Sequence, residues 1–326
     1  MSLEASSDAV LCARGLEVSY PARGGAVHAV RGVSLHIGRG ECLGIVGESG
    51  AGKSQTFLAA MGLLGRGARA AGSVRFEGRE ILGLPPAALN AFRGARLAMI
   101  FQDPMTSLTP HVRVGVQLAE VLVHHAGARW REAERRALEV LQRVQVPEAP
   151  RRMRQYPHEL SGGLRQRVMI GMGLMCGPSL LIADEPTSAL DLRVQAQIIE
   201  LLRALKAESS LSVALVSHDV GVIASLADRI VVMYAGRIVE SGPARELLRA
   251  ARHPYTASLI RCVPSLAGPR PPRMAFIPGQ APAPAQADEG CAFAPRCPRA
   301  TRLCREERPA LRAADGAGEF ACHHPL

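Results

Sequence analysis

The chain has 326 residues, of which 48% are apolar and 4% aromatic, and a formal net charge of +10. This length and apolar content suffice for one large or two modest domains with a packed core and without disulfides. The positive charge does not by itself select a partner. Arginine and glutamate are mixed through stretches such as 129–154, which favours solvated helix faces, and aromatic residues for base stacking are scarce. We therefore expect no nucleic-acid partner.

The sequence also predicts neither secretion nor a membrane span. The opening residues carry Glu4 and Asp8 and no sustained apolar run, so we expect no secretory leader. The most apolar stretch, 168–183, is interrupted by several glycines and a proline. It is shorter than the roughly 20 residues that a spanning helix needs.

Strands and a helix are predicted in the first hundred residues. Short runs with β-branched residues predict strands over 16–20, 32–37, 41–46, 73–76 and 97–101. The strand over 41–46 leads directly into a glycine-rich loop. Good helix formers after this loop predict a helix over 53–64, and 85–92 is expected to contain a short helix.

The pattern changes twice along the rest of the chain. Helical periodicity with Arg/Glu pairs over 112–153 predicts an inserted helical subdomain, which we place at about 112–173. Strand and helix patterns then alternate, which predicts a parallel sheet covered by helices. The expected strands are 180–183, 212–217 and 229–234, and the expected helices are 193–206 and a segment from Val220. A shift to proline and glycine divides the chain into a domain over 10–264 and an extension over 265–326.

The glycine-rich loop has the pattern of a phosphate-binding loop. It consists of Gly47, Glu48, Ser49, Gly50, Ala51, Gly52, Lys53 and Ser54. Its glycines let backbone N–H groups approach the β- and γ-phosphates of a nucleotide, and the following helix directs its positive dipole end toward them. We expect Lys53 to reach the same phosphates and Ser54 to ligate Mg²⁺.

Polar residues that suit phosphate chemistry follow three of the predicted strands. The strand over 180–183 ends in Asp184 and Glu185, an arrangement in which the first acid holds Mg²⁺ and the second polarises the attacking water. Gln102 and His218 follow two other strands, so we expect both beside the γ-phosphate at the carboxyl edge of the sheet. Tyr20 is a candidate for stacking on adenine, with a half-buried strand tyrosine as the alternative.

A further motif, Leu160-Ser161-Gly162-Gly163-Leu164-Arg165-Gln166, is absent from simple nucleotide-binding proteins. Together with the phosphate loop, Gln102, Asp184-Glu185, the segment 188–191 and His218, it occurs in the order found in ATP-binding cassette ATPases. The chain resembles that family over about residues 10–260. The resemblance implies an α/β fold: a P-loop NTPase ABC cassette with a parallel-sheet core, an antiparallel β-subdomain and a helical subdomain, plus a small Cys-rich C-terminal extension.

Four other segments resemble the oligopeptide/dipeptide importer subfamily and its D-type ATP-binding subunit. They are 101–108, 194–198, His253-Pro254-Tyr255 and Ile277-Pro278-Gly279. The sequence departs from the family pattern at Leu164, where methionine is usual, at Thr109-Pro110, where Asn-Pro is common, and at Leu192-Arg193, where Val-Thr usually follows the aspartate. None of these departures removes a catalytic group.

The resemblance implies roles for individual residues. Glu185, His218 and Gln102 are the implied catalytic residues, and Ser54, Gln102 and Asp184 are the implied Mg²⁺ ligands. Ser161, Gly162, Gly163 and Gln166 would complete the ATP site of a facing subunit, and Asp191 would couple the two sites. Tyr20, the phosphate loop and Gln55 would contact ATP.

The same resemblance implies partners and a location. The chain would pair with a second ATPase beneath two membrane-spanning permeases, at the cytoplasmic face of the inner membrane, fed by an extracytoplasmic peptide-binding protein. The segment after Gln102 would receive the permeases. Import of nickel or another small solute by the same architecture is one alternative. A non-transport cassette ATPase acting on ribosomes or DNA is another, but such proteins usually carry two cassettes or a long coiled coil.

Four cysteines crowd into the last 36 residues: Cys291, Cys297, Cys304 and Cys322. Four thiolates are the complete ligand set of a cubane iron–sulfur cluster. The tail also resembles that of peptide-importer ATPases described as carrying a [4Fe–4S] cluster. Zinc with wide ligand spacing, in which His323 or His324 replaces a cysteine, is an alternative. Two disulfides and a metal-free site are the others.

Overall fold

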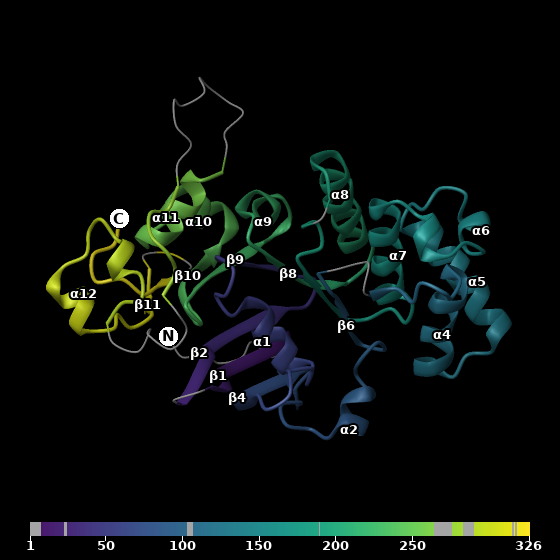
Figure 1. The fold of residues 1–326 in the computed structure, drawn as a ribbon, viewed down its shortest axis with the longest axis horizontal. Helices are drawn as coiled ribbons and strands as arrows, with labels where there is room; N and C mark the ends of the chain where they lie inside the picture. The colour runs from purple at the N-terminus through teal and green to yellow at the C-terminus, as the bar shows by residue number, and fades with distance from the viewer. Residues whose placement is uncertain are drawn as a thin grey trace. The chain divides into compact units, whose positions relative to one another are not determined.

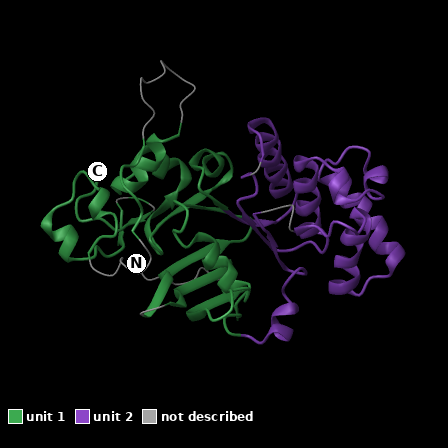
Figure 2. Ribbon diagram, in the orientation of Figure 1, with its two compact units in different colours: residues 1–83, 216–326 green, residues 84–215 purple. Residues whose placement is uncertain are grey.

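The computed structural model describes residues 8–22, 25–102, 107–188, 190–263, 276–282, 290–314, 316 and 318–326. The chain forms two compact units, one of residues 1–83 with 216–326 and the other of residues 84–215 (Figure 2). Residues 103–106, which follow Gln102, and Ala189, in the segment before Asp191, lie outside the described residues. So does most of the proline-rich segment after residue 263.

An antiparallel sheet opens the first unit. Its strands are β1 (Ala9–Ala22), β2 (Gly25–Gly38), β4 (Arg69–Phe76) and β5 (Arg79–Glu80), in the order β2-β1-β4-β5. Leu11 of β1 lies opposite Ile37 on one side and Phe76 on the other, and all three are buried. The strands β1 and β2 are longer than predicted because they pair with each other along their whole length. The pairing extends both strands into polar end segments, which lack the apolar alternation that predicts a strand.

The phosphate-loop strand belongs to a second sheet of this unit. Its strands are β3 (Cys42–Val46), β9 (Arg229–Tyr234), β10 (Arg237–Pro243), β12 (Glu319–Phe320) and β11 (Arg312–Ala313), in the order β11-β12-β10-β9-β3. The pair β3–β9 is parallel, and Leu43 lies opposite Arg229. Helix α9 (Val220–Leu226) packs closely on β3: a Cβ added at Gly44 would lie 2.4 Å from a methyl carbon of Ile223.

Helix α1 (Lys53–Ala60) follows the loop and packs on β1 and β2 (Figure 1). It ends four residues before the predicted end. The cause is Gly62, whose φ of 60° breaks the helix, while the N–H of Leu63 donates to the carbonyl of Leu58 at 2.8 Å. This is the glycine C-terminal motif that ends many helices.

The C-terminal extension joins the first unit through a strand. Antiparallel pairing places Phe320 of β12 opposite Glu240 of β10, and the N–H of Ala321 donates to the carbonyl of Val239 at 2.8 Å. The remaining helices of the unit are short. They are α10 (Ala244–Arg249), α11 (Pro254–Arg261), the 3-10 turn η2 (Ala294–Arg296) and α12 (Arg302–Glu306).

The second unit contains the predicted helices of 112–173 and a group of buried strands. Its helices are α2 (Pro86–Asn90), α4 (Val114–Ala126), α5 (Trp130–Arg143), α6 (Ala149–Arg152), η1 (Pro157–Glu159), α7 (Gly162–Leu174) and α8 (Leu192–Glu208). Helix α5 buries Ala133, Ala137, Val140 and Leu141, which recur at helical spacing. The helical prediction for this region is confirmed.

The strands of this unit are β6 (Leu97–Ile100) and β7 (Leu180–Asp184), which are parallel with Leu97 opposite Leu180. Strand β8 (Ser212–Ser217) is the neighbour of β7, and within it the chain passes back into the first unit. Across the described ranges, no helix is both long enough and apolar enough to cross a bilayer.

Candidate functional site

The phosphate loop lies between β3 and α1, as predicted. Two of its glycines are required by close backbone contacts. A Cβ at Gly47 would lie 2.2 Å from the carbonyl oxygen of Met233, and one at Gly52 would lie 2.4 Å from that of Ala29. Gly52 also has a φ of 95°, which L residues rarely adopt. The strand–loop–helix context of the motif is therefore confirmed, and two of its three glycines are required sterically.

Lys53 is held inside this loop. The side chain is 7% exposed, and its Nζ donates to the carbonyl oxygens of Gly47 at 2.7 Å and Glu48 at 3.1 Å. Thr56 Oγ1 donates to the Gly52 carbonyl at 3.0 Å and so ties the first turn of α1 to the loop. A buried ammonium among loop N–H groups at a helix start is chemically suited to bind phosphate.

Tyr20 lies on β1 and contacts α1. Its hydroxyl donates to Oε1 of Gln55 at 2.5 Å, and both residues are half-buried. This bond holds the ring in a fixed orientation, and it gives Gln55 a role in placing Tyr20. Stacking on adenine stays a prediction.

Glu48 has two partners that the sequence did not reveal. Its backbone N–H donates to Oη of Tyr255 at 2.9 Å, and its carboxylate accepts two hydrogen bonds from Arg296. Tyr255 belongs to the His-Pro-Tyr segment, and His253 caps α11 by accepting from the N–H of Tyr255 at 3.0 Å. The sequence offered only one signal, the likeness of this segment to the peptide-importer subfamily.

The acidic pair lies at the end of β7 in the second unit. Asp184 is 6% exposed and Glu185 is 9% exposed. Glu185 has a φ of 51°, an unusual value for a non-glycine residue, and its carbonyl accepts from the N–H and the hydroxyl of Ser188 at 3.3 and 3.1 Å. Residues held in such strained conformations concentrate at functional sites. Buried carboxylates also provide the oxygen ligands that Mg²⁺ prefers.

Gln102 and His218 each follow a strand and are exposed. Gln102 follows β6 in the second unit, and His218 follows β8 in the first. The next residue, Asp219, caps α9: its Oδ1 accepts from the N–H of Gly221 at 2.7 Å. This capped helix fixes the backbone immediately after His218.

The motif over 160–166 begins helix α7. Ser161 is the N-cap residue, and both Ser161 and Gly162 are exposed. Gly163 faces the neighbouring helix α8, where an added Cβ would lie 2.7 Å from Cγ1 of Val194. Gln166 is 2% exposed, and its Nε2 has no hydrogen-bond partner among the described residues. The exposed part of the motif is thus a helix N-terminus, a place suited to an anion.

Asp191 has a clear local role, while its coupling of two ATP sites stays a prediction. It is the N-cap of α8, and its Oδ1 accepts from the N–H groups of Arg193 and Val194, both at 3.0 Å. Of the predicted site residues, the first unit holds Tyr20, the phosphate loop, Gln55 and His218. The second holds Gln102, the motif over 160–166, the acidic pair and Asp191.

The four tail cysteines line one small cavity of about 10 Å³ together with three histidines: Cys291, Cys297, Cys304, Cys322, His253, His323 and His324. None of these cysteines is in a disulfide. Burial raises the pKa of the Cys291 and Cys322 thiols, and the neighbouring cysteines raise it further. The donor set has the chemistry of a thiolate metal site, but the cavity has room for about one water molecule. Among the described residues, which include all four cysteines, no three ligating side chains are arranged to hold a metal ion.

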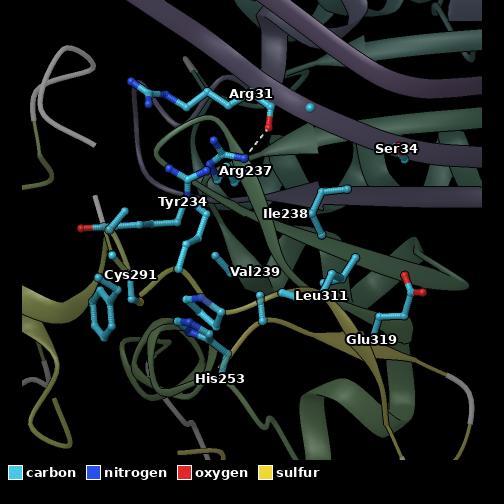
Figure 3. A pocket seen from close by; sticks show the side chains of 18 residues that line it. Arg31, Ser34, Tyr234, Arg237, Ile238, Val239, His253, Cys291, Leu311 and Glu319 are labelled. Atoms are coloured by element: carbon cyan, nitrogen blue, oxygen red, sulfur yellow. Dashed lines mark hydrogen bonds between the residues drawn. The ribbon is translucent and has the colours of Figure 1, made fainter. Parts of the chain in front are cut away.

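A larger cavity of about 420 Å³ lies where the extension meets the rest of the first unit (Figure 3). Arg31 and Arg237 line one side, and Nη1 of Arg237 donates to the Arg31 carbonyl at 2.9 Å. Leu311 and Glu319 of the extension line another side. No residue of 47–54 lines this cavity, so it is separate from the phosphate loop.

Solved structures share this architecture. The dimeric post-hydrolysis structure of the ATP-binding cassette MJ0796, bound to ADP and Pi, covers 72% of this chain and 99% of its own, with a TM-score of 0.65 and 28% identity. Clostridium perfringens cbiO1, part of an ABC transporter complex, covers 74% of this chain and 91% of its own, with a TM-score of 0.64 and 27% identity. Residues 30–188 match the ABC transporter family. The fold and site define an ATPase of the ABC transporter class.

Proteins with similar sequences identify the family within the ABC transporter class. The oligopeptide transport ATP-binding protein OppD of Salmonella typhimurium is 49% identical over 95% of this chain and 92% of its own length. The protein of the same name from Haemophilus influenzae is 47% identical over 91% of both chains. Residues 239–304 match the oligopeptide/dipeptide transporter C-terminal region. The chain belongs to the family of oligopeptide transport ATP-binding proteins.

Proposed function

We propose that this chain hydrolyses ATP to drive the uptake of oligopeptides or dipeptides across the cytoplasmic membrane. The observation that carries the peptide assignment is the match of residues 239–304 to the oligopeptide/dipeptide transporter C-terminal region. This region includes Cys291, Cys297 and Cys304 and the whole of α11. The relatives named for oligopeptide transport cover more than nine-tenths of the chain, extension included.

The residues of the first unit are assigned to nucleotide binding. Lys53 and the loop N–H groups bind the β- and γ-phosphates, and Ser54 supplies a hydroxyl to Mg²⁺. Tyr20 stacks on adenine, and its hydrogen bond to Gln55 fixes the ring for that purpose. His218 donates to the γ-phosphate. The steric requirement for Gly47 and Gly52 supports this assignment, because it keeps the loop backbone in one conformation.

The acidic pair is assigned to the chemical step. Asp184, with Gln102, provides oxygen ligands for Mg²⁺, which when bound neutralises charge on the phosphate oxygens. Glu185 orients and polarises the attacking water. Its low exposure and its positive φ support this role, since both restrict the carboxylate to one position.

A second ATPase subunit is proposed to complete each ATP site. Ser161, Gly162 and Gly163 of this chain would contact the γ-phosphate bound by the partner. The exposure of Ser161 and Gly162 at the start of α7 supports this assignment. Asp191, which caps α8, would couple the two sites. The solved structure of the cassette MJ0796 is dimeric, and we propose a heterodimer for this chain.

The assembly is proposed to lie peripherally at the cytoplasmic face of the inner membrane. Two permeases would bind the ATPase pair, and an extracytoplasmic peptide-binding protein would deliver the peptide. Import of nickel or another small solute remains the alternative within the same architecture. A role on ribosomes or DNA is a more distant one.

The four tail cysteines are proposed to bind a metal group. A [4Fe–4S] cluster is the first expectation and zinc the alternative. The shared cavity of the four thiols supports a common ligand, although their present arrangement is not a coordination shell. Anaerobic purification followed by iron, sulfide and zinc analysis tests this. Preparations without stoichiometric iron or zinc would overturn it.

Co-purification tests the transport function. The tagged chain should be recovered from gently solubilised membranes with two polytopic permeases and a second cassette ATPase, identified by mass spectrometry. The reconstituted complex with its binding protein should then show ATPase activity that peptides stimulate and nickel salts do not. If the tagged chain is recovered only with ribosomes or DNA, the assignment as an ATPase still holds and the proposed transport function is overturned.

A further inference from the structure

The C-terminal extension contacts the phosphate loop through one partly buried ion pair. Arg296, the last residue of η2, donates from Nη1 to Oε2 of Glu48 at 2.7 Å and from Nη2 to Oε1 at 2.9 Å. The Arg296 side chain is 5% exposed and that of Glu48 is 27% exposed. Such paired, parallel hydrogen bonds to a carboxylate are among the strongest and most directional in proteins.

The guanidinium of Arg296 is held by every one of its donors. Besides the two bonds to Glu48, Nη1 donates to the Tyr234 hydroxyl at 3.2 Å. Nε donates to the Pro278 carbonyl at 2.8 Å and Nη2 to the Ile277 carbonyl at 3.3 Å. These five bonds use all five N–H groups that an arginine has. The group is thus preorganised to receive Glu48 and has little freedom to move elsewhere.

Aromatic rings enclose the same group. The Arg296 guanidinium carbon lies 5.9 Å from the ring centre of Tyr234 and 6.0 Å from that of Phe293. Tyr255 packs against both rings and also accepts the backbone N–H of Glu48. Two segments that resemble the peptide-importer subfamily therefore meet at Glu48. The His-Pro-Tyr segment reaches Glu48 through Tyr255, and the Ile-Pro-Gly segment reaches it through the carbonyls that bind Arg296. We call Arg296, Tyr234, Tyr255 and Phe293 the loop clamp.

The loop clamp acts on the part of the loop that holds the lysine. The Glu48 carbonyl accepts from Nζ of Lys53 at 3.1 Å and from the N–H of Ala51 at 3.1 Å. The side chain and the N–H of Glu48 are bound by the loop clamp, so its carbonyl is fixed toward Lys53. Arg296 also neutralises a carboxylate that would otherwise repel phosphate.

The loop clamp is one of several connections between the described part of the extension and the rest of the first unit. Others include the short pairing of β12 with β10, the bond from the N–H of Leu326 to the Arg252 carbonyl and the packing of Phe293 on His253. The cavity of about 420 Å³ lies between them, with Tyr234 and Phe293 in its wall (Figure 3). Arg296 is thus a direct contact from the extension to the phosphate loop, and Phe293 is an indirect one through Tyr255.

We propose that Arg296 is a positioning residue for ATP binding, through which the C-terminal extension sets the nucleotide affinity of the phosphate loop. The proposal rests on the assignment of 47–54 to nucleotide binding made above. It gives the extension a role in the ATPase cycle that is separate from any metal that its cysteines bind.

A double-mutant cycle on the full-length chain tests the proposal, with the Kd for ATP measured in Mg²⁺-containing buffer by fluorescent-nucleotide displacement. Arg296→Ala should raise the Kd about fivefold to tenfold, because the unpaired Glu48 carboxylate then repels the phosphates. Glu48→Ala removes that carboxylate. It leaves the Arg296 guanidinium without its partner, but a positive charge does not repel the phosphates, so the Kd should rise by less than about twofold. Adding Arg296→Ala to Glu48→Ala should then have no further effect. In steady-state assays the Arg296→Ala change should appear in KM and leave kcat unchanged.

Three variants separate this role from a general structural one. Arg302→Ala removes an exposed ion pair with Glu306 elsewhere in the extension and should leave the Kd unchanged. Arg296→Lys keeps the positive charge, so its affinity for ATP should lie between those of Arg296→Ala and the unmodified chain. If Arg296→Ala does not fold, Arg296→Lys is compared with the unmodified chain instead. Lys53→Ala should weaken ATP binding whatever Arg296 does.

The outcomes are distinct. An unchanged Kd in Arg296→Ala, or the same loss with Glu48 present and absent, overturns the proposal while leaving the phosphate-loop assignment intact. Unchanged ATP affinity in Lys53→Ala overturns the phosphate-loop assignment and the proposal with it.

Discussion

The hydroxyl oxygen of Tyr255 accepts a 2.9 Å hydrogen bond from the backbone N–H of Glu48, so helix α11 and the phosphate loop are joined directly. Tyr255 is fully buried, and its ring packs against Tyr234 at a centroid distance of 4.5 Å. Burial raises the pKa of Tyr255, which keeps the phenol neutral at physiological pH. The conformation of the loop thus depends on a residue 207 positions away in the sequence.

Tyr255→Phe should test this link. The variant keeps the ring and its packing, but it leaves the Glu48 N–H without its partner, which should lower the free energy of unfolding by about 1 kcal/mol. The ATP affinity should fall modestly, because the loop loses one restraint. Chemical denaturation and nucleotide titration measure the two effects. Identical curves for the variant and the unmodified chain would show that the bond contributes nothing.

Glu185→Gln should separate binding from hydrolysis. The amide keeps the size of the side chain but cannot polarise water, so ATP turnover should fall at least about a hundredfold while the Kd for ATP stays close to that of the unmodified chain. Phosphate release and nucleotide binding are measured on the same preparation. Glu208→Gln, an exposed residue of α8, is a matched control with normal turnover expected. Undiminished hydrolysis by Glu185→Gln would refute the proposed role.

Ser161→Arg should block dimer closure without affecting binding to the chain's own phosphate loop. The new side chain projects from the exposed start of α7, where a facing ATP is proposed to bind. In a Glu185→Gln background with the partner ATPase, ATP should then fail to produce the dimer peak in size-exclusion chromatography. Gln142→Arg adds the same charge at an exposed site on α5 and should leave dimerisation intact. Dimerisation by Ser161→Arg would contradict the facing-subunit assignment.

His253 should make the stability of the fold sensitive to mild acid. Burial lowers its pKa to about 4, below the ordinary value of 6.5. The unfolded chain therefore binds this proton more readily, and stability is lost as the pH falls from 6.5 toward 4. Between about pH 7.5 and about pH 5 the loss from this residue should be about 2 kcal/mol.

His253→Asn provides the comparison. Asparagine also caps helices well, so it can replace the bond from His253 Nδ1 to the N–H of Tyr255 without titrating. The variant should be less stable than the unmodified chain at neutral pH. At about pH 5 this difference in the free energy of unfolding should be smaller by about 2 kcal/mol, because only the unmodified chain loses stability through His253. Denaturation at the two pH values measures it. A difference that does not change with pH would mean that His253 does not take up the proton.

The sequence predicted well those features whose cause is local. A run of apolar residues before Gly47 and good helix formers after Lys53 were enough to place β3, the phosphate loop and α1. Helical spacing placed α5, and the strand ending in Asp184 was found from its apolar run and its acids. In each case neighbouring residues determine the conformation through periodicity, steric requirement or hydrogen bonding.

Other elements were missed or misjudged because their cause is distant. β12 is two residues long and exists because it pairs with β10, and no local pattern marks it. The full lengths of β1 and β2 come from their mutual pairing. Helix α1 is a different case, because the prediction ran too far past Gly62, a local signal that ends the helix.

The chemical groups of this protein can be read from short stretches of sequence: the phosphate loop, the acidic strand end, the motif at the start of α7 and the four tail thiols. The contacts that support these groups depend on the folded chain. Arg296 and Glu48 are 248 residues apart, and no local sequence pattern at either position predicts that they pair. Their pairing depends on the docking of the extension, on the carbonyls of Ile277 and Pro278 and on the rings of Tyr234 and Phe293. Long-range burial, which no short segment encodes, creates this contact.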